Sequence, residues 1–149
     1  MVRKDYISWD TFFMRTARTA AQRSKDPKTQ VGCVIKNELN HVVAVGYNGM
    51  PRGIPDTDEF WNDSVKHDYV VHAEANAILN STEDLTGSTA YVTLFPCNEC
   101  TKLLIQKGIK EIVYEDDKFH NKKETIASRK LLDSAGVEYR QYENEKETK

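Results

Sequence analysis

The chain has little of what marks disulfide-rich, membrane-spanning or nucleic-acid-binding proteins. Its 149 residues include three cysteines, an odd and small number that favours metal or redox chemistry over a disulfide framework. Its apolar runs are far shorter than a membrane span. Twenty-one Lys and Arg residues against 23 Asp and Glu residues give a net charge of −2, without the positive excess that draws proteins to phosphate backbones. We therefore expect a small-molecule ligand, with no membrane and no nucleic acid polymer as partner.

The length and the two ends of the chain predict its organisation. A chain of 149 residues fits one domain, and a domain of this size buries about two thirds of the surface that its unfolded chain exposes. The first ten residues lack the apolar stretch of a secretory signal, so we expect a cytoplasmic protein. We expect a single domain over 1–149, with a flexible tail at 143–149 because that stretch contains no apolar residue.

Apolar periodicity predicts an α/β fold. Residues 37–40 separate two β-branched runs and predict a hairpin. Residues 48–69 form a stretch with four Gly or Pro among its first eight residues, longer than most connections and typical of a functional loop. The later alternation of strands and helices predicts a partly parallel sheet covered by helices. We expect helices over about 9–22, 71–80, 97–107 and 124–134, and strands over 31–36, 41–47, 91–95, 109–114 and 137–142.

Two motifs combine histidine and cysteine at spacings typical of a zinc centre. His72-Ala73-Glu74 opens one predicted helix, and Pro96-Cys97-Asn98-Glu99-Cys100 opens the next helix after an intervening strand. Cys97 and Cys100 are three residues apart and share one helix face, and the N–H groups at a helix start stabilise the thiolates that zinc requires. With His72 they make three protein ligands, which leaves the fourth position of a tetrahedral zinc open for a water.

Glu74 is interpreted as the catalytic residue. It lies two residues after His72, and at a helix tip both side chains can reach inward. We expect it to leave the metal free and to carry a proton from a zinc-activated water to ring nitrogen N3 and then to the leaving amine. H-x-E followed by P-C-x-x-C is the signature of zinc nucleobase deaminases, and the chain matches it in residue type and order.

Other interpretations of these motifs remain open. A lone Cys-x-x-Cys is often a redox or structural zinc motif, and a lone His-x-Glu is commonly chance. A closed structural site would need a fourth ligand from the remaining cysteine and histidines, none of which shows close ligand spacing. These residues are Cys33, His41, His67 and His120. Cys33 is expected to be a buried strand residue.

Four stretches resemble the deoxycytidylate deaminase family, within the wider cytidine-deaminase-like fold. The two zinc motifs belong to the whole superfamily, whereas the first two stretches narrow the resemblance to the deoxycytidylate branch. The resemblance spans about Trp9 to Tyr142 and implies a three-layer α/β/α sandwich with a central mixed five-stranded sheet. The stretches are AQRSKDP (21–27), GYNGMPRG (46–53), HAEANAI (72–78) and FPCNEC (95–100) with the downstream DKFH (117–120).

The resemblance implies roles for individual residues. His72, Cys97 and Cys100 would hold zinc and Glu74 would shuttle the proton. Asn48 would hydrogen-bond the nucleoside, although such an Asn can equally cap a turn. Arg23, Ser24 and Lys25 would lie near the 5′-phosphate, although they could also form only a solvated helix end. The remaining substrate-binding candidates are Ala73, Phe119 and His120, of which the last two could also be residues of ordinary surface packing.

The resemblance also implies a reaction and its regulation. The reaction is hydrolysis of dCMP to dUMP and ammonia, feeding dTMP synthesis. Family members are hexamers activated by dCTP and inhibited by dTTP at a site that would include Tyr47, Asn48 and Gly49, with Mg²⁺ accompanying the triphosphate. The chain departs from the family at Ala75 and at Phe119, where Tyr is common.

Rival functions are deamination of free cytidine, a nucleoside triphosphate, guanine or adenosine in transfer RNA, and a noncatalytic zinc module. The near-neutral charge weighs against an RNA substrate.

Overall fold

A computed structural model describes residues 1–144 of the chain. These residues form a five-stranded sheet in the order β2-β1-β3-β4-β5. The strand β1 pairs antiparallel with β2 and β3, whereas β3, β4 and β5 run parallel. The predicted α/β fold with a mixed five-stranded sheet is therefore confirmed. The strands are β1 (Gly32–Lys36), β2 (Val42–Tyr47), β3 (Thr89–Leu94), β4 (Glu111–Asp116) and β5 (Glu138–Gln141).

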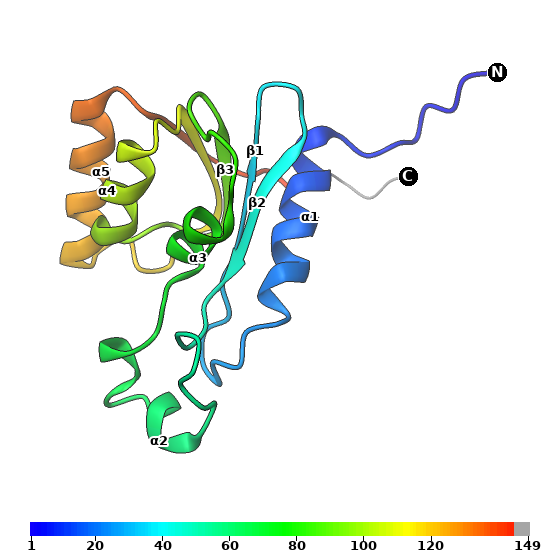
Figure 1. Ribbon diagram of the computed structural model, residues 1–149. Coiled ribbons are helices and arrows are strands. Elements are labelled where there is room, and N and C mark those ends of the chain that lie inside the picture. Colours follow the sequence, from blue (N-terminus) through cyan, green and yellow to red (C-terminus); the bar gives the residue numbers. More distant parts are fainter. Residues whose placement is uncertain (145–149) are drawn as a thin grey trace.

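Helices cover both faces of the sheet, which gives three layers (Figure 1). The helix α1 (Trp9–Ala21) lies on one face, and α3 (Ala73–Asn80), α4 (Asn98–Gln106) and α5 (Lys123–Ala135) lie on the other. Side chains alternate along β1, so Val34 packs with Phe13 under α1 while Cys33 and Ile35 pack under α3 and α4. A strand covered on both faces is apolar throughout, and Cys33 is fully buried there.

Local side-chain chemistry explains where several elements begin and end. The hydroxyl of Ser8 accepts a hydrogen bond from the Thr11 N–H and caps the start of α1. In the hairpin, Asn37 accepts from the backbone N–H groups of Leu39 and His41. Asn40 adopts a left-handed φ of 63°, a conformation that asparagine tolerates better than most residues.

Several element boundaries differ from the sequence expectation by one or two residues, and the strand expected over 109–114 covers Glu111–Asp116. The helix expected from residue 71 begins at Ala73, because His72 is its extended N-cap residue. The loop after β2 contains a short helix α2 (Asp58–Trp61) and a 3-10 turn η1 (Lys66–Asp68), and it extends past the ends of β1 and β2 (Figure 1). Of the flexible tail expected at 143–149, residues 145–149 lie outside the described residues. Within residues 1–144, no helix combines the length and apolarity needed to cross a membrane.

Candidate functional site

The two zinc motifs meet at the starts of two helices. His72 is the N-cap residue of α3 and Cys97 is the N-cap residue of α4, with Cys100 one turn further along α4. The Nδ1 atom of His72 lies 3.5 Å from Sγ of Cys97 and 3.4 Å from Sγ of Cys100. The three ligand atoms all lie within 4.8 Å of one another. His72 thus forms one cluster with two cysteines that are 25 and 28 positions away in the sequence.

The cluster fits a zinc ion. With Zn–N of about 2.0–2.1 Å and Zn–S of about 2.3 Å, a tetrahedral ion would hold a nitrogen and a sulfur about 3.6 Å apart. The observed separations of 3.5 and 3.4 Å agree with that value. The group comprises three residues, His72, Cys97 and Cys100, and a zinc with three protein ligands retains an open position, as catalytic zinc sites do.

The electrostatics of the cluster favour a thiolate. A hydrogen bond from Cys100 lowers the pKa of Cys97 to about 4, with burial opposing this shift and His72 reinforcing it. The same contact with Cys97 raises the pKa of His72. Zinc binds the deprotonated form of cysteine, so Cys97 favours the ionisation state that the metal requires, whereas the contact with Cys97 and burial raise the pKa of Cys100 above its ordinary value.

Glu74 lies buried on the first turn of α3, beside the cluster. Its side chain is 4% exposed, and burial raises its pKa to about 7, with the nearby His72 opposing this shift. A carboxyl group with a pKa near the working pH can both accept and donate a proton. The residue is therefore in a state suited to acid–base chemistry next to the metal ligands.

Gly46 allows α3 to pack directly on the sheet edge. A β-carbon at this position of β2 would overlap the backbone of Ala73 and Ala77 in α3. Because Ala73 separates His72 from Glu74, the close approach at Gly46 sets where both functional side chains lie relative to the sheet.

Gly46→Ala is expected to lower the free energy of unfolding by about 1–3 kcal/mol, because α3 must move to relieve the overlap. Chemical denaturation measures the change. Gly49→Ala is the matched control, since its β-carbon would lie 3.7 Å from Cε1 of Tyr47, an ordinary contact. Equal stability of the two variants would show that α3 does not depend on the glycine.

The structure brings some of the substrate and effector candidates into one pocket. This pocket has a volume of about 270 Å³ and is lined by Arg23, Lys25, Tyr47, Gly49 and Arg52, among other residues. The guanidinium of Arg23 lies 6.0 Å from the centre of the Tyr47 ring. Asp56 also lines the pocket and pairs with Lys25 at 2.7 Å, which leaves a net positive charge beside an aromatic ring, a combination that suits an anionic, ring-bearing ligand.

The other candidates lie elsewhere. Asn48 is buried, with its Oδ1 accepting from the Val31 N–H at 2.8 Å and its Nδ2 donating to the Thr29 carbonyl at 3.0 Å. Ser24 donates to the Asn48 carbonyl at 2.9 Å. Ala73 is fully buried within the first zinc motif.

Phe119 and His120 lie in the loop between β4 and α5. Phe119 is half-buried, and the Lys118 and Lys122 ammonium groups lie 5.3 and 4.1 Å from the centre of its ring. His120 is exposed and its Nδ1 lies 3.1 Å from the Asp117 carbonyl. This loop follows the carboxyl end of β4, next to the end of β3 that leads to Cys97.

Three residues with a place in this region were not singled out as site residues from the sequence. Arg52 lines the pocket that also contains Arg23 and Lys25, called the basic pocket below. Its position in the GYNGMPRG stretch was the sequence feature that could have marked it as a binding residue. Asp26 and Lys66 form a buried ion pair. Asp26 lies in the AQRSKDP stretch, but its position before Pro27 is also typical of a solvated helix end. For Lys66, no sequence signal indicates burial.

Comparison with known proteins adds to this geometry. A family model, the cytidine and deoxycytidylate deaminase zinc-binding region, matches residues 7–116. The chain is 48% identical over 147 residues to the deoxycytidylate deaminase of Pongo abelii, covering 94% of this chain and 83% of that protein. It is 48% identical over 158 residues to a probable deoxycytidylate deaminase of Drosophila melanogaster, covering 98% and 78%.

The fold is also similar to a solved structure. The dCMP deaminase from the cyanophage S-TIM5, crystallised in complex with dCMP and dUMP, superposes with a TM-score of 0.77 at 26% identity, covering 92% of this chain and 100% of that chain. With the His/Cys/Cys cluster in place and the family model spanning both zinc motifs, the chain belongs to the deoxycytidylate deaminase family of zinc-dependent enzymes.

Proposed function

We propose that this protein hydrolyses dCMP to dUMP and ammonia and thereby feeds dTMP synthesis. The observation that carries the proposal is the His/Cys/Cys cluster with the buried Glu74 beside it. Relatives at 48% identity are deoxycytidylate deaminases, and the similar cyanophage enzyme was crystallised with both dCMP and dUMP. One domain over 1–149 would carry this chemistry.

In this proposal the protein residues position the metal and move the protons. His72, Cys97 and Cys100 hold the zinc ion, which when bound supplies a positive charge that lowers the pKa of a water to about 7. Glu74 accepts one proton from the attacking water and gives it to ring N3, and it then moves the remaining proton of the resulting C4 hydroxyl to the leaving amine. A C4–O bond forms, the C4–N bond breaks, and ammonia leaves.

Substrate contacts come from three places in the fold. Asn48 would hydrogen-bond the nucleoside from its buried position. Ala73, the residue after His72, would contact the substrate next to the candidate zinc ligands. Arg23, Ser24 and Lys25 would meet the 5′-phosphate, supported by the positive charge that two of them bring to the pocket. Phe119 and His120 would approach from the loop after β4, where the adjacent lysines also favour an anion.

The basic pocket supports regulation by nucleotides. Tyr47 and Gly49 line it, so we propose that dCTP as activator and dTTP as inhibitor bind at Tyr47, Asn48 and Gly49, beside the residues that meet the substrate phosphate, with Mg²⁺ on the triphosphate. A homo-hexamer would complete the site at a subunit interface. We place the enzyme in the cytoplasm, where reducing conditions keep thiolate ligands available.

Purified, zinc-loaded protein is expected to release ammonia from dCMP with a kcat/KM at least about 100-fold above that for deoxycytidine, because the phosphate contacts are lost in the nucleoside. CMP and dCTP serve as further comparisons, each assayed with and without dCTP or dTTP as effector. Failure to turn over any cytosine substrate with zinc bound would contradict the proposal. It would leave guanine or adenosine deamination and the noncatalytic zinc module.

A further inference from the structure

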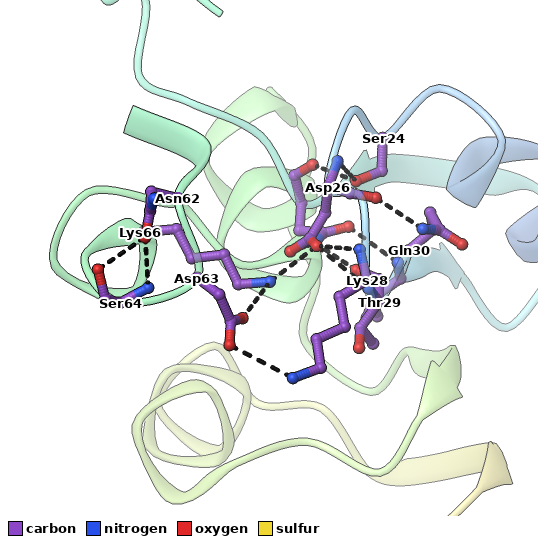
Figure 2. A network of polar contacts seen from close by, with 11 residues as sticks. Ser24, Asp26, Lys28, Thr29, Gln30, Asn62, Asp63, Ser64 and Lys66 are labelled. Atoms are coloured by element: carbon purple, nitrogen blue, oxygen red, sulfur yellow. Dashed lines mark hydrogen bonds and ion pairs between the residues drawn. The ribbon is translucent and has the colours of Figure 1, made fainter. Parts of the chain in front are cut away.

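A buried ion pair joins the loop after β2 to the segment between α1 and β1, residues 22–31. Lys66, in the 3-10 turn η1, places its Nζ 2.8 Å from Oδ1 of Asp26 and 3.2 Å from Oδ1 of Asp63. Figure 2 shows the ammonium group between the two carboxylates. The side chains of Lys66 and Asp26 are only 4% and 6% exposed. Lysine is almost never fully buried unless it is paired.

Two further ion pairs join the same segments, but both are solvated. Lys25 and Asp56 are 2.7 Å apart with side chains 57% and 36% exposed, and Lys28 and Asp63 are 3.3 Å apart with side chains 70% and 58% exposed. Exposed pairs contribute little because water and salt screen them. The buried pair therefore fixes the position of one segment relative to the other, whereas the two exposed pairs add little to this contact.

Within residues 22–31, the Asp26 carboxylate is the group on which the hydrogen bonds converge. Besides Lys66, its carboxylate accepts from the backbone N–H groups of Lys28 and Thr29 at 2.8 and 3.1 Å and from the Asn48 amide at 3.4 Å. Burial alone would raise the pKa of Asp26, but the hydrogen bonds from Lys66 and the two amides hold it below its ordinary value. Four donors converge on one charged group, which specifies a single arrangement.

The contacts continue from Asp26 to Val71, the residue that precedes His72. The Asn48 side chain accepts from the Val31 N–H at 2.8 Å. The next residue, Gly49, exchanges two backbone hydrogen bonds with Val71, at 3.0 and 2.8 Å. Val71 directly precedes His72. The buried pair is thus connected to Asn48, and Asn48 to the point where the chain enters the zinc cluster.

We infer that the Asp26–Lys66 pair positions Asn48 at a fixed place relative to His72 for nucleotide binding, so that Lys66 is a positioning residue of the active site. The inference rests on the proposed dCMP deaminase function. A charged pair in the interior costs more than an apolar contact of the same size, and its value lies in the geometry that it imposes on the four groups around Asp26.

Steady-state kinetics of Lys66→Met test the inference. Removing the ammonium leaves Asp26 without its main partner, and we expect KM for dCMP to rise by about tenfold or more with a smaller change in kcat. The zinc content stays at the wild-type level, because Glu74 and the three candidate ligands lie at the starts of α3 and α4. Lys28→Met is the matched control, a lysine of the same network whose side chain is exposed, and its kinetic constants stay within about twofold of wild type.

A second variant covers the case in which Lys66→Met does not fold. Asp26→Asn combined with Lys66→Met removes both charges and leaves none buried, and we expect the same rise in KM. Kinetic constants within about twofold of wild type in either folded variant would overturn the inference. Failure of both variants to fold would show a purely structural role and would also overturn it. Lack of dCMP turnover by the wild-type protein would instead refute the proposed function.

Discussion

Glu74→Gln is expected to lower kcat for dCMP deamination by about 1,000-fold or more while the protein keeps its zinc. Glutamine preserves the size of a side chain that is 4% exposed, so the fold is retained. The amide cannot take a proton from the attacking water or return one to the leaving amine. Ammonia release measures the rate, and metal analysis of the same sample measures the zinc.

Glu99→Gln is the matched control for this variant. Glu99 is an exposed residue of α4 inside the second zinc motif, and its carboxylate contacts only the Lys102 ammonium, at 3.1 Å, among the interactions of residues 1–144. We expect its kcat to stay within about twofold of wild type. If Glu74→Gln kept more than about a tenth of the wild-type kcat, Glu74 would not be the proton shuttle.

Cys100→Ser is expected to abolish turnover together with zinc binding. A serine hydroxyl does not ionise at neutral pH, so the cluster would retain only His72 and Cys97 as ligands. Metal binding to the native state also stabilises it, so the thermal midpoint of the variant should fall to that of wild-type protein stripped with a chelator. Metal analysis, ammonia release and calorimetry check the three effects.

The control for this variant is Cys33→Ala. Cys33 is fully buried in the core of the sheet and outside the ligand cluster. Its replacement should reduce stability modestly through the small cavity but leave one zinc per chain. Adding zinc back to stripped wild-type protein should restore turnover, whereas the Cys100→Ser variant should stay inactive. Full zinc content in Cys100→Ser would show that Cys100 is not a ligand.

The candidate zinc ligands could be predicted from the sequence because local patterns mark the helix starts at which they lie. His72 and Cys97 each begin a helix, and Cys100 lies one turn after Cys97. Three-residue spacing on a helix start places two sulfurs on one face whatever surrounds the helix. The partly parallel sheet could also be predicted, since alternating strands and helices allow few sheet topologies.

The surroundings of the site could not be predicted in the same way. Lys66 belongs to a residue type that is normally exposed, and its burial depends on Asp26, 40 positions away. The identity of Asn48 does not tell whether its side chain caps a local turn or hydrogen-bonds a distant segment. In the structure it holds Val31 and Thr29, a role decided by contacts across 17 and 19 positions.

The sequence by itself determined the α/β fold and the chemistry of the zinc centre, because periodicity, helix starts and short ligand spacings act over a few residues. Only the tertiary structure decided which polar groups are buried together. It gathered Arg23, Lys25 and Arg52 into one pocket with Tyr47 and buried Lys66 against Asp26. The physical reason is that burial and charge pairing depend on the positions of segments far apart in the chain, and no local pattern encodes those positions.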